Sequence, residues 1–474
     1  MLDFILNILA TPAILVGLLA MVGLILQKKA VEDVVKGTIK TIVGFLVLSA
    51  GADFIQTGSL TAFGQLFNWT FNMTGTVPNN EAIVALALRD FGLDTSYIMV
   101  LGLLLNIVLA RFSKMHYIFL TGHHSLYMAC MLAALLGPIG GLSGFPLWIA
   151  GGCLLAFISA FSPYFLHKSM EKIVETDELG FGHFGGLGYW VSAQCGKLFK
   201  GSKSTEELDF PQRLTFLRDT TVSIGITMVL FFLVVTAIAV MKGILRVDQA
   251  TLAEQGLGAC AGLIIPGETK THWAVWALLS GLRFSGAVYI ILSGVRLIVG
   301  ELVPAFKGIA EKLVPGAVPA IDCPVVFPYA PNAVLIGFLV SFAGGVVGLL
   351  VLILLNNAGL GLALILPGVV PHFFCGASAG VFGNAEGGVK GCVLGSFVHG
   401  LLITFLPALC MPVFDALDKG STFSDADFSW MALVFGNLAK VVRGLPLLVI
   451  CVVVYVLPMI LSGFKNGFEK KASE

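Results

Sequence analysis

Charged residues are scarce in this sequence of 474 residues, since Asp, Glu, Lys and Arg together make up 12% of it. Soluble globular chains carry about 25%. The 28 basic residues also balance the 28 acidic ones, so no excess of positive charge would attract nucleic acid. The composition excludes an ordinary soluble protein and predicts no nucleic-acid partner.

Motifs of metal sites, redox dithiols and nucleotide sites are missing as well. The nine cysteines are scattered, and no Cys-x-x-Cys pair occurs, which argues against a disulfide scaffold, a zinc site and a redox dithiol. No Gly-x-x-x-x-Gly-Lys-Ser/Thr loop occurs, so the chain is not its own ATPase. We therefore expect no metal and no cofactor.

Long polar stretches are also lacking. The longest, the predicted cytoplasmic loop 167–218, is too short and too rich in glycine to form an independent core. We expect residues 1–474 to form a single membrane unit without a soluble phosphocarrier domain. If the protein needs such a carrier, another chain supplies it.

Apolar residues are abundant instead, at 57% of the chain, with a mean hydropathy of +0.94. A membrane-spanning helix needs about 20 mostly apolar residues. The sequence predicts an all-α polytopic membrane protein with about 11 transmembrane helices plus re-entrant segments. The candidate spans are 4–26, 38–56, 96–111, 116–136, 145–165, 219–241, 273–298, 333–355, 358–371, 391–414 and 445–463. Two of them, 96–111 and 358–371, are short for a full span.

Basic residues in the loops predict the orientation, because Lys and Arg gather on the cytoplasmic side. With eleven spans and the N-terminus outside, most of them fall on one side. The residues on that side are Lys28, Lys29, Lys36, Arg111, Lys114, Lys168, Lys172, Lys197, Lys200, Lys203, Arg213, Arg218, Lys465, Lys470 and Lys471. The opposite loops, 57–95 and 415–430, have few basic residues. The acidic residues of the second loop are Asp415, Asp418, Asp425 and Asp427.

Five polar or helix-breaking segments interrupt this apolar chain at apparent membrane depth. They are 77–83, 121–127, 180–190, 315–332 and 367–388. Irregular backbone at that depth is tolerated only where protein or a water-filled cavity covers it, and transporter sites are commonly built from such elements. These segments therefore hold the candidate site residues.

The adjacent histidines His123 and His124 face different sides of a helix. They could be hydrogen-bonded residues of a helix-packing interface, but the run Gly-His-His-Ser in an apolar helix favours a site. No third ligand has a spacing typical of a metal site. For His183, in a segment with five glycines in nine residues, the alternatives are a flexible cytoplasmic loop and a re-entrant segment. The flanking aromatic residues favour the re-entrant segment.

Asp322 lies between prolines that cannot belong to one regular helix. It is either paired structurally or a ligand for hydroxyl groups, and an ionisable residue within the membrane favours the second. Asn79 or Asn80 can cap a helix with Glu81 in its first turn, and a ligand role is equally open. Glu386 fits a helix-packing turn better. The two glycine-rich breaks, about 200 residues apart, hint at an internal repeat.

Several of these stretches, in this order, resemble the enzyme IIC permease of the L-ascorbate (Ula) branch of the bacterial phosphotransferase system (PTS). The resemblance covers nearly the whole chain, and Gly-Thr-Ile-Lys-Thr and Ala-Ile-Asp-Cys followed by Ala-Pro-Asn-Ala are its most specific parts. The matching stretches are 36–45, 121–123, 182–183, 315–323, 330–333 and 367–368.

The resemblance implies a substrate-binding core domain, a dimerisation domain and a homodimer in the bacterial cytoplasmic (inner) membrane, surrounded by lipid. It also implies separate IIA and IIB partners, with a phosphocysteine of IIB as the phosphate donor. The substrate-binding residues implied by position are Asn80, Glu81, His123, His124, Ser125, Leu126, Tyr127, His183, Phe184 and Asp322. Two positions depart from the ascorbate pattern, because Tyr127 and Phe184 stand where ascorbate members carry glutamine.

The expected substrate is therefore L-ascorbate or a related polyol or sugar. Asp322 can accept hydrogen bonds from two hydroxyl groups, and His123 and His183 can donate or accept. His183 and Asp322 are also the two candidates for a base at the phosphorylated hydroxyl. One alternative is an ion-coupled secondary transporter in which Asp322 titrates. The other is a membrane protein with a structural or assembly role, which the buried polar segments disfavour.

Overall fold

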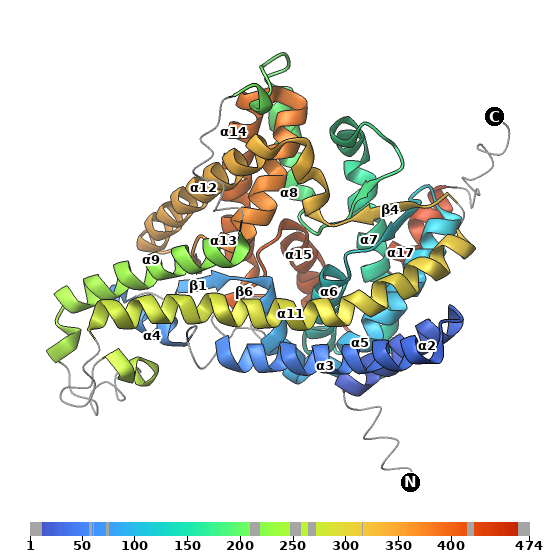
Figure 1. Cartoon of the computed structure of the whole chain (residues 1–474), viewed down its shortest axis with the longest axis horizontal. Helices are drawn as coiled ribbons and strands as arrows, with labels where there is room; N and C mark the ends of the chain where they lie inside the picture. The colour runs from blue at the N-terminus through green and yellow to red at the C-terminus, as the bar shows by residue number, and fades with distance from the viewer. Residues whose placement is uncertain are drawn as a thin grey trace, which may run out of the picture.

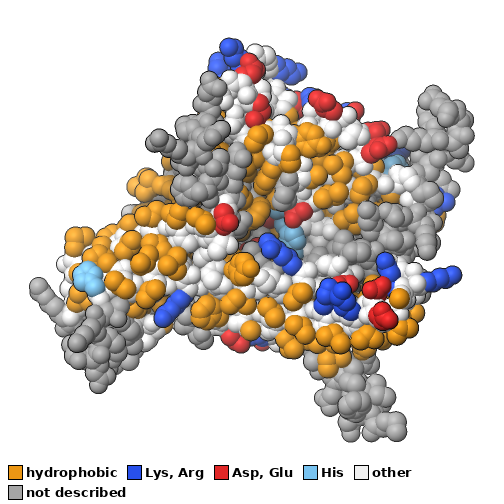
Figure 2. Space-filling model, viewed as in Figure 1, with side chains coloured by type: hydrophobic (Ala, Val, Ile, Leu, Met, Phe, Trp, Pro, Cys, Tyr) orange, Lys and Arg blue, Asp and Glu red, His pale blue; other side chains and the backbone are white. Residues whose placement is uncertain are grey.

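The fold is a bundle of apolar helices, seen here in a computed structural model that describes residues 12–55, 59, 61–72, 75–208, 219–246, 257–263, 272–314, 316–414 and 421–462. Among these residues, seven helices are long and apolar enough to cross a membrane. Hydrophobic side chains cover much of the face shown in Figure 2, and charged residues gather towards its edges. The expected all-α polytopic membrane protein is confirmed, whereas the number of eleven spans stays a prediction. Residues 4–11 of the first predicted span, Pro315 and the basic residues beyond 462 lie outside the described residues.

The long helices surround a centre that contains short helices and strands (Figure 1). Helix α11 runs across the molecule, with α3 below it and α8, α12 and α14 above. The helices are α2 (Pro12–Leu26), α3 (Val31–Ile55), α4 (Thr61–Phe71), α5 (Asn80–Phe112), α6 (Gly122–Ala134), α7 (Gly144–Val174), α8 (Gly186–Lys197), α9 (Thr220–Met241), α11 (Trp273–Leu313), α12 (Pro331–Asn357), α13 (Val369–Pro371), α14 (Ala377–Cys410), α15 (Ala426–Met431), α16 (Asn437–Val441) and α17 (Leu445–Leu461).

Six short strands form two parallel three-stranded sheets. The first sheet has the order β5-β1-β6 and the second β2-β4-β3. The strands are β1 (Gly75–Pro78), β2 (Tyr117–Phe119), β3 (Gly180–Phe181), β4 (Val318–Ile321), β5 (Leu364–Ile365) and β6 (Ser421–Thr422). Pairing within these sheets satisfies backbone groups that could not stay unpaired in an apolar interior.

The sheets reveal an internal repeat. Strands β1, β2 and β3 of the first half correspond to β4, β5 and β6 of the second, and the equivalent strands start 243, 247 and 241 residues apart. The central strand of each sheet comes from one half of the chain and its two neighbours from the other half. The same offset matches α3 with α11. The predicted repeat is therefore present, but the offset matches β3 with β6 rather than with the glycine-rich segment 367–388.

Several predicted spans need correction. The span 96–111 is the second part of α5, which begins at Asn80, so the predicted loop 57–95 is wrong for residues 80–95. The span 116–136 becomes helical only at Gly122, because β2 precedes it. Residues 358–371 form no spanning helix, since two glycines with positive φ, Gly359 and Gly361, end α12 before β5. The span 391–414 extends backwards to His372.

Helix α14 bends within its glycine-rich part. Gly388 has φ 57° and ψ −150°, a conformation that glycine adopts far more easily than other residues. A Cβ atom there would lie 2.2 Å from the carbonyl oxygen of Lys203. Beside the bend, Glu386 pairs with Lys172 of α7 at 2.7 Å and accepts a hydrogen bond from Ser169 at 3.2 Å. Glu386 therefore joins two helices, in agreement with the predicted packing role.

Candidate functional site

The candidate site lies where strands of both sheets end. Each strand leads within a few residues into a helix or helical turn, and five of them are followed by polar side chains at that point. These side chains are Asn80 and Glu81 after β1, His123 and His124 after β2, His183 after β3, Asp322 after β4 and Asp425 after β6. The sheets thereby bring together residues that are far apart in the sequence. Helix N-termini at such a site favour negatively charged or hydroxyl-rich groups.

Local hydrogen bonds fix the strand ends. Asn79 caps α5 by accepting from the Ala82 backbone N–H at 2.7 Å, so the expected helix cap is Asn79. This frees Asn80 for a different contact. The Thr121 hydroxyl donates to the Gly182 carbonyl oxygen and joins the ends of β2 and β3. The glycine-rich segment that contains Gly182 is buried within the protein, as the re-entrant interpretation predicts.

Asp425 is the centre of the buried part of the site. Its Oδ1 atom accepts from Asn80 Nδ2 at 2.8 Å and from the Ser424 hydroxyl at 2.7 Å. Its Oδ2 atom lies 3.9 Å from His124 Nε2 and 3.9 Å from His183 Nδ1. The side chains of Asp425 and the two histidines are at most 4% exposed. One carboxylate thus faces two imidazole rings away from bulk water.

A second acidic pair forms the open part of the site. His123 Nε2 lies 3.5 Å from Asp322 Oδ2, and these side chains are 28% and 32% exposed. The other oxygen of Asp322 accepts from the Cys323 backbone N–H at 2.8 Å. The ligand atoms of His183, Asp322 and Cys323 lie within 4.8 Å of one another, so His183 connects the open and the buried parts. The two adjacent histidines face different carboxylates, as expected from their positions on the helix.

The hydrogen bonds of the histidines disfavour a metal ion at this site. Among the described residues, every group of His, Asp and Cys close enough to share an ion contains His124 or His183. The backbone N–H of Phe184 donates to His124 Nδ1 at 3.2 Å, so the neutral ring carries its proton on Nε2 and has no lone pair there for a metal. His183 Nδ1 is engaged with the Tyr189 hydroxyl at 2.7 Å. The arrangement suits hydrogen bonding to hydroxyl groups better.

Two polar atoms of the site lack a hydrogen-bond partner within the described part of the chain. They are Glu81 Oε2 and the Tyr127 hydroxyl, and both are buried. The Tyr127 ring lies 5.7 Å from that of His123 and 6.1 Å from that of His124. Buried polar atoms are rarely left without a partner, and a bound ligand is one explanation.

The remaining predicted site residues lie in less polar surroundings. Ser125 donates to the Thr121 carbonyl oxygen at 3.4 Å, within its own helix. Leu126 belongs to the apolar core. The ring of Phe184 is fully buried and stacks on Phe119 with ring centres 4.5 Å apart. The structure therefore brings together Asn80, Glu81, His123, His124, Tyr127, His183 and Asp322.

The sequence interpretation missed Asp425. The predicted outer loop 415–430 is wrong for residues 421–430, because Asp425 and Asp427 are 2% and 1% exposed and belong to the interior. Ser424-Asp425-Ala426-Asp427 before an aromatic run is typical of a helix N-terminus, as at Asn79–Glu81. That similarity is the signal that could have identified the residue.

Comparison with known proteins agrees with this geometry. The family model described as "PTS system sugar-specific permease component" (EIIC-GAT) matches residues 7–427. The chain belongs to this family. The permease is also 27% identical, over 91% of its own length and 70% of the other chain, to the "Ascorbate-specific PTS system EIIC component" of Mycoplasma pneumoniae.

Membership establishes the general function. The permease is the IIC component of a sugar phosphotransferase system and imports a sugar across a membrane that it crosses several times. IIA and IIB partner proteins are implied by the same membership. The site described above is the polar centre of an otherwise apolar permease.

Proposed function

We propose that this permease imports L-ascorbate or a related polyol or sugar, and that a separate IIB protein phosphorylates the substrate during import. The convergence of Asn80, His124, His183 and Asp425 from four strand ends carries this proposal. The name of the Mycoplasma pneumoniae relative supports ascorbate as the first substrate to test.

The chemistry of the site matches a small molecule rich in hydroxyl groups. His124 offers an N–H donor, while Asp322, Asp425 and Glu81 offer acceptor oxygens. A hydroxyl group can donate to a carboxylate and accept from an imidazole at the same time. A site built to pair with hydroxyl groups should reject analogues that lack them, because its own buried groups would be left unpaired.

Phosphoryl transfer requires positioning and charge neutralisation more than covalent chemistry by this chain. The S–P bond of the IIB phosphocysteine would break, and an O–P bond to a substrate hydroxyl would form. We propose that His183 or Asp322 takes the proton released from that hydroxyl. The phosphate monoester would then be too polar to return through an apolar pathway.

Transport into membrane vesicles tests the proposal. The vesicles contain the permease and receive the cognate IIA and IIB proteins, a phosphate donor and labelled L-ascorbate or a panel of pentitols and hexitols. We expect one of these solutes to accumulate as its phosphate ester. Unmodified solute that follows a proton or sodium gradient would contradict the proposal and favour the ion-coupled transporter.

A substitution then tests the site itself. Asp322→Asn keeps a good helix cap for the Cys323 N–H but removes the charge that faces His123. We expect the apparent affinity for the transported solute to fall about ten- to hundredfold. Asp219→Asn is the matched control, since Asp219 caps α9 through the Val222 N–H. An equal effect of both substitutions would contradict a binding role for Asp322.

The family resemblance supports further assignments as proposals. We propose a homodimer in the bacterial cytoplasmic membrane, with the N-terminus outside and the C-terminus in the cytoplasm. The division into a substrate-binding core and a dimerisation domain belongs to the same proposal. Apolar side chains exposed on the spanning helices, such as Leu230 and Val234 of α9, support contact with lipid.

A further inference from the structure

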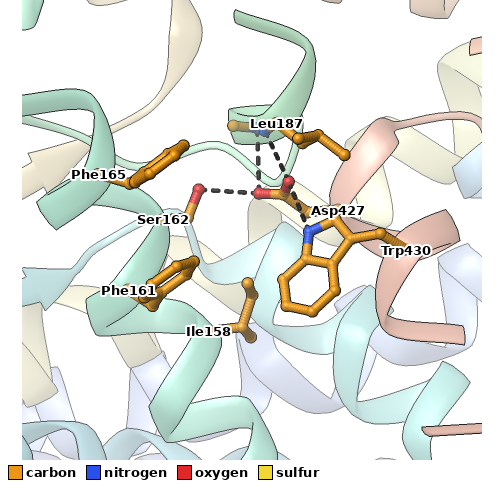
Figure 3. A pocket seen from close by; sticks show the side chains of 8 residues that line it. Ile158, Phe161, Ser162, Phe165, Leu187, Asp427 and Trp430 are labelled. Atoms are coloured by element: carbon orange, nitrogen blue, oxygen red, sulfur yellow. Dashed lines mark hydrogen bonds between the residues drawn. The ribbon is translucent and has the colours of Figure 1, made fainter. Parts of the chain in front are cut away.

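Asp427 is a buried carboxylate beside the site, and all its hydrogen bonds join separate elements. Its Oδ2 atom accepts from the Ser162 hydroxyl at 2.8 Å and the Gly186 N–H at 3.0 Å. Its Oδ1 atom accepts from the Leu187 N–H at 2.8 Å and the Trp430 indole N–H at 3.1 Å. We name these five residues the Asp427 clamp (Figure 3). The clamp joins α7, the N-terminus of α8 and α15.

The clamp connects equivalent positions of the internal repeat. The turn after β3 carries His183, and the turn after β6 carries Asp425. The Asp427 N–H also donates to the Phe184 carbonyl oxygen at 2.9 Å, so the two turns are bonded in both directions. A Cβ atom at Gly186 would lie 2.2 Å from the Ser162 hydroxyl oxygen, so this close approach requires glycine.

An apolar cavity of about 390 Å³ adjoins the clamp. Phe161, Phe165, Leu187 and Trp430 line it (Figure 3). Asp427 itself is 1% exposed. The carboxylate is therefore desolvated, and its four donors are what stabilise it. Such a group holds its partners in one arrangement, since losing any donor leaves part of a buried charge unpaired.

We infer that Asp427 is a positioning residue that fixes His183 relative to Asp425. The Asp427 carboxylate contacts neither of these side chains in the structure. It fixes the backbone on which His183 stands, immediately before α8, against the start of α15, immediately after Asp425. The inference rests on the proposed function only in taking His183 and Asp425 as substrate ligands.

Asp427→Asn is the informative substitution because it conserves size. Each carboxylate oxygen accepts from two donors. An amide replaces one of these oxygens by an NH₂ group, which would face two donors without a lone pair to offer. Either Ser162 and Gly186, or Leu187 and Trp430, would lose their acceptor. The turn after β3 would then shift or open.

Chemical modification of histidines tests the inference without a substrate. The full-length permease in detergent is treated with diethyl pyrocarbonate, and modification of each histidine is followed by peptide mass spectrometry. In the Asp427→Asn variant, we expect His183, which is 3% exposed in the native protein, to react about ten- to hundredfold faster. His372 and His399, buried elsewhere, should react at the native rate.

Transport kinetics provide the second readout. We expect Asp427→Asn to raise KM for L-ascorbate, or for the solute that the native permease transports, by about tenfold or more, with a smaller change in kcat. Asp94→Asn is the matched control, because Asp94 also accepts from an indole, that of Trp148 at 2.7 Å, but contacts neither turn. It should leave KM and the reactivity of His183 unchanged.

The outcomes separate this inference from the proposed function. Native reactivity at His183 in the variant, or an equal acceleration at His372, would overturn the positioning role, the second because it indicates general loosening. If the native permease transported none of the solutes, the proposed function would fail, and the histidine readout would still decide the role of Asp427.

Discussion

At the scale of single residues, Tyr127 and Phe184 differ in a way that affects recognition. The Tyr127 hydroxyl is buried and has no hydrogen-bond partner within the described part of the protein. Phe184 is packed among other aromatic rings, with Phe119 stacked on it and Phe428 edge-on. One position therefore offers a polar group to a ligand, while the other belongs to the apolar core.

Tyr127→Phe tests the role of the unpartnered hydroxyl. We expect thermal stability to stay the same or rise slightly, because no internal hydrogen bond is lost. The affinity for the transported solute should fall by about tenfold. Binding and thermal unfolding are measured on the same purified protein. Tyr455→Phe is the control, since the Tyr455 hydroxyl donates to the Leu105 carbonyl oxygen at 3.0 Å. It should lower stability and leave affinity unchanged, and the same result for both variants would contradict the interpretation.

The sequence predicted the histidines and Asp322 because they interrupt apolar segments. It missed Asp425, since an acidic stretch between helices also fits an outer loop. Only the pairing of β6 with β1 brings Asp425 to Asn80, 345 positions away in the sequence. Such a non-local contact is not visible in one sequence.

At the scale of elements, the bend in α14 is fixed by glycine. The backbone of Gly388 occupies a region that is strained for residues with a Cβ atom. Its position also leaves no room, because the carbonyl oxygens of Ser202 and Lys203 approach it closely. The bend places the loop after α8 against α14.

Gly388→Ala should therefore destabilise the protein by about 1–3 kcal/mol, the usual cost of a strained backbone position. Thermal unfolding in detergent measures this. Gly64→Ala in α4 is the control, since a Cβ atom there meets open space and φ is not positive. Alanine is the better helix former, so this change should be neutral or slightly stabilising. Equal loss in both variants would show that the bend does not depend on glycine.

Most elements could be predicted from apolar runs, but their limits could not. Helix α5 carries Arg89, Asp90 and Asp94 in its first half, which lowers the local hydropathy below that of a span. Strands of two to four residues are too short for a periodic pattern. Their pairing depends on partners in the other half of the chain.

At the scale of the whole molecule, α12 separates two ends of the structure. Its first turn is bonded to the segment after α8, since Asn332 Nδ2 donates to the Thr205 carbonyl oxygen at 3.0 Å. Its 27 residues span about 40 Å. Lys200 and Ala358 therefore belong to opposite ends of the molecule, whichever end faces the cytoplasm.

Cysteine labelling tests the predicted orientation. We expect Lys200→Cys to react with a membrane-impermeant maleimide only in inside-out vesicles, and Ala358→Cys only in right-side-out vesicles. The unsubstituted protein, whose Cys195 is half-buried, gives the background. The reverse pattern would mean that the distribution of Lys and Arg misled the prediction.

The internal repeat was suggested by the sequence, but its form was not. Two glycine-rich breaks indicated repetition, whereas the exchange of central strands between the halves depends on β1 and β4. Neither strand has a glycine or histidine pattern that resembles the other. Three-dimensional equivalence has outlasted similarity of sequence.

The exchange of strands has a consequence for biosynthesis. After Pro78, the ribosome must add 344 residues before Thr422, the last partner of β1, exists. At about 5–20 residues per second, this takes roughly 20–70 s. Throughout that time the backbone of β1 has no sheet partner and cannot rest unpaired in lipid. The first half of the permease must therefore wait, within the insertion machinery or at the membrane surface, until the second half has been made.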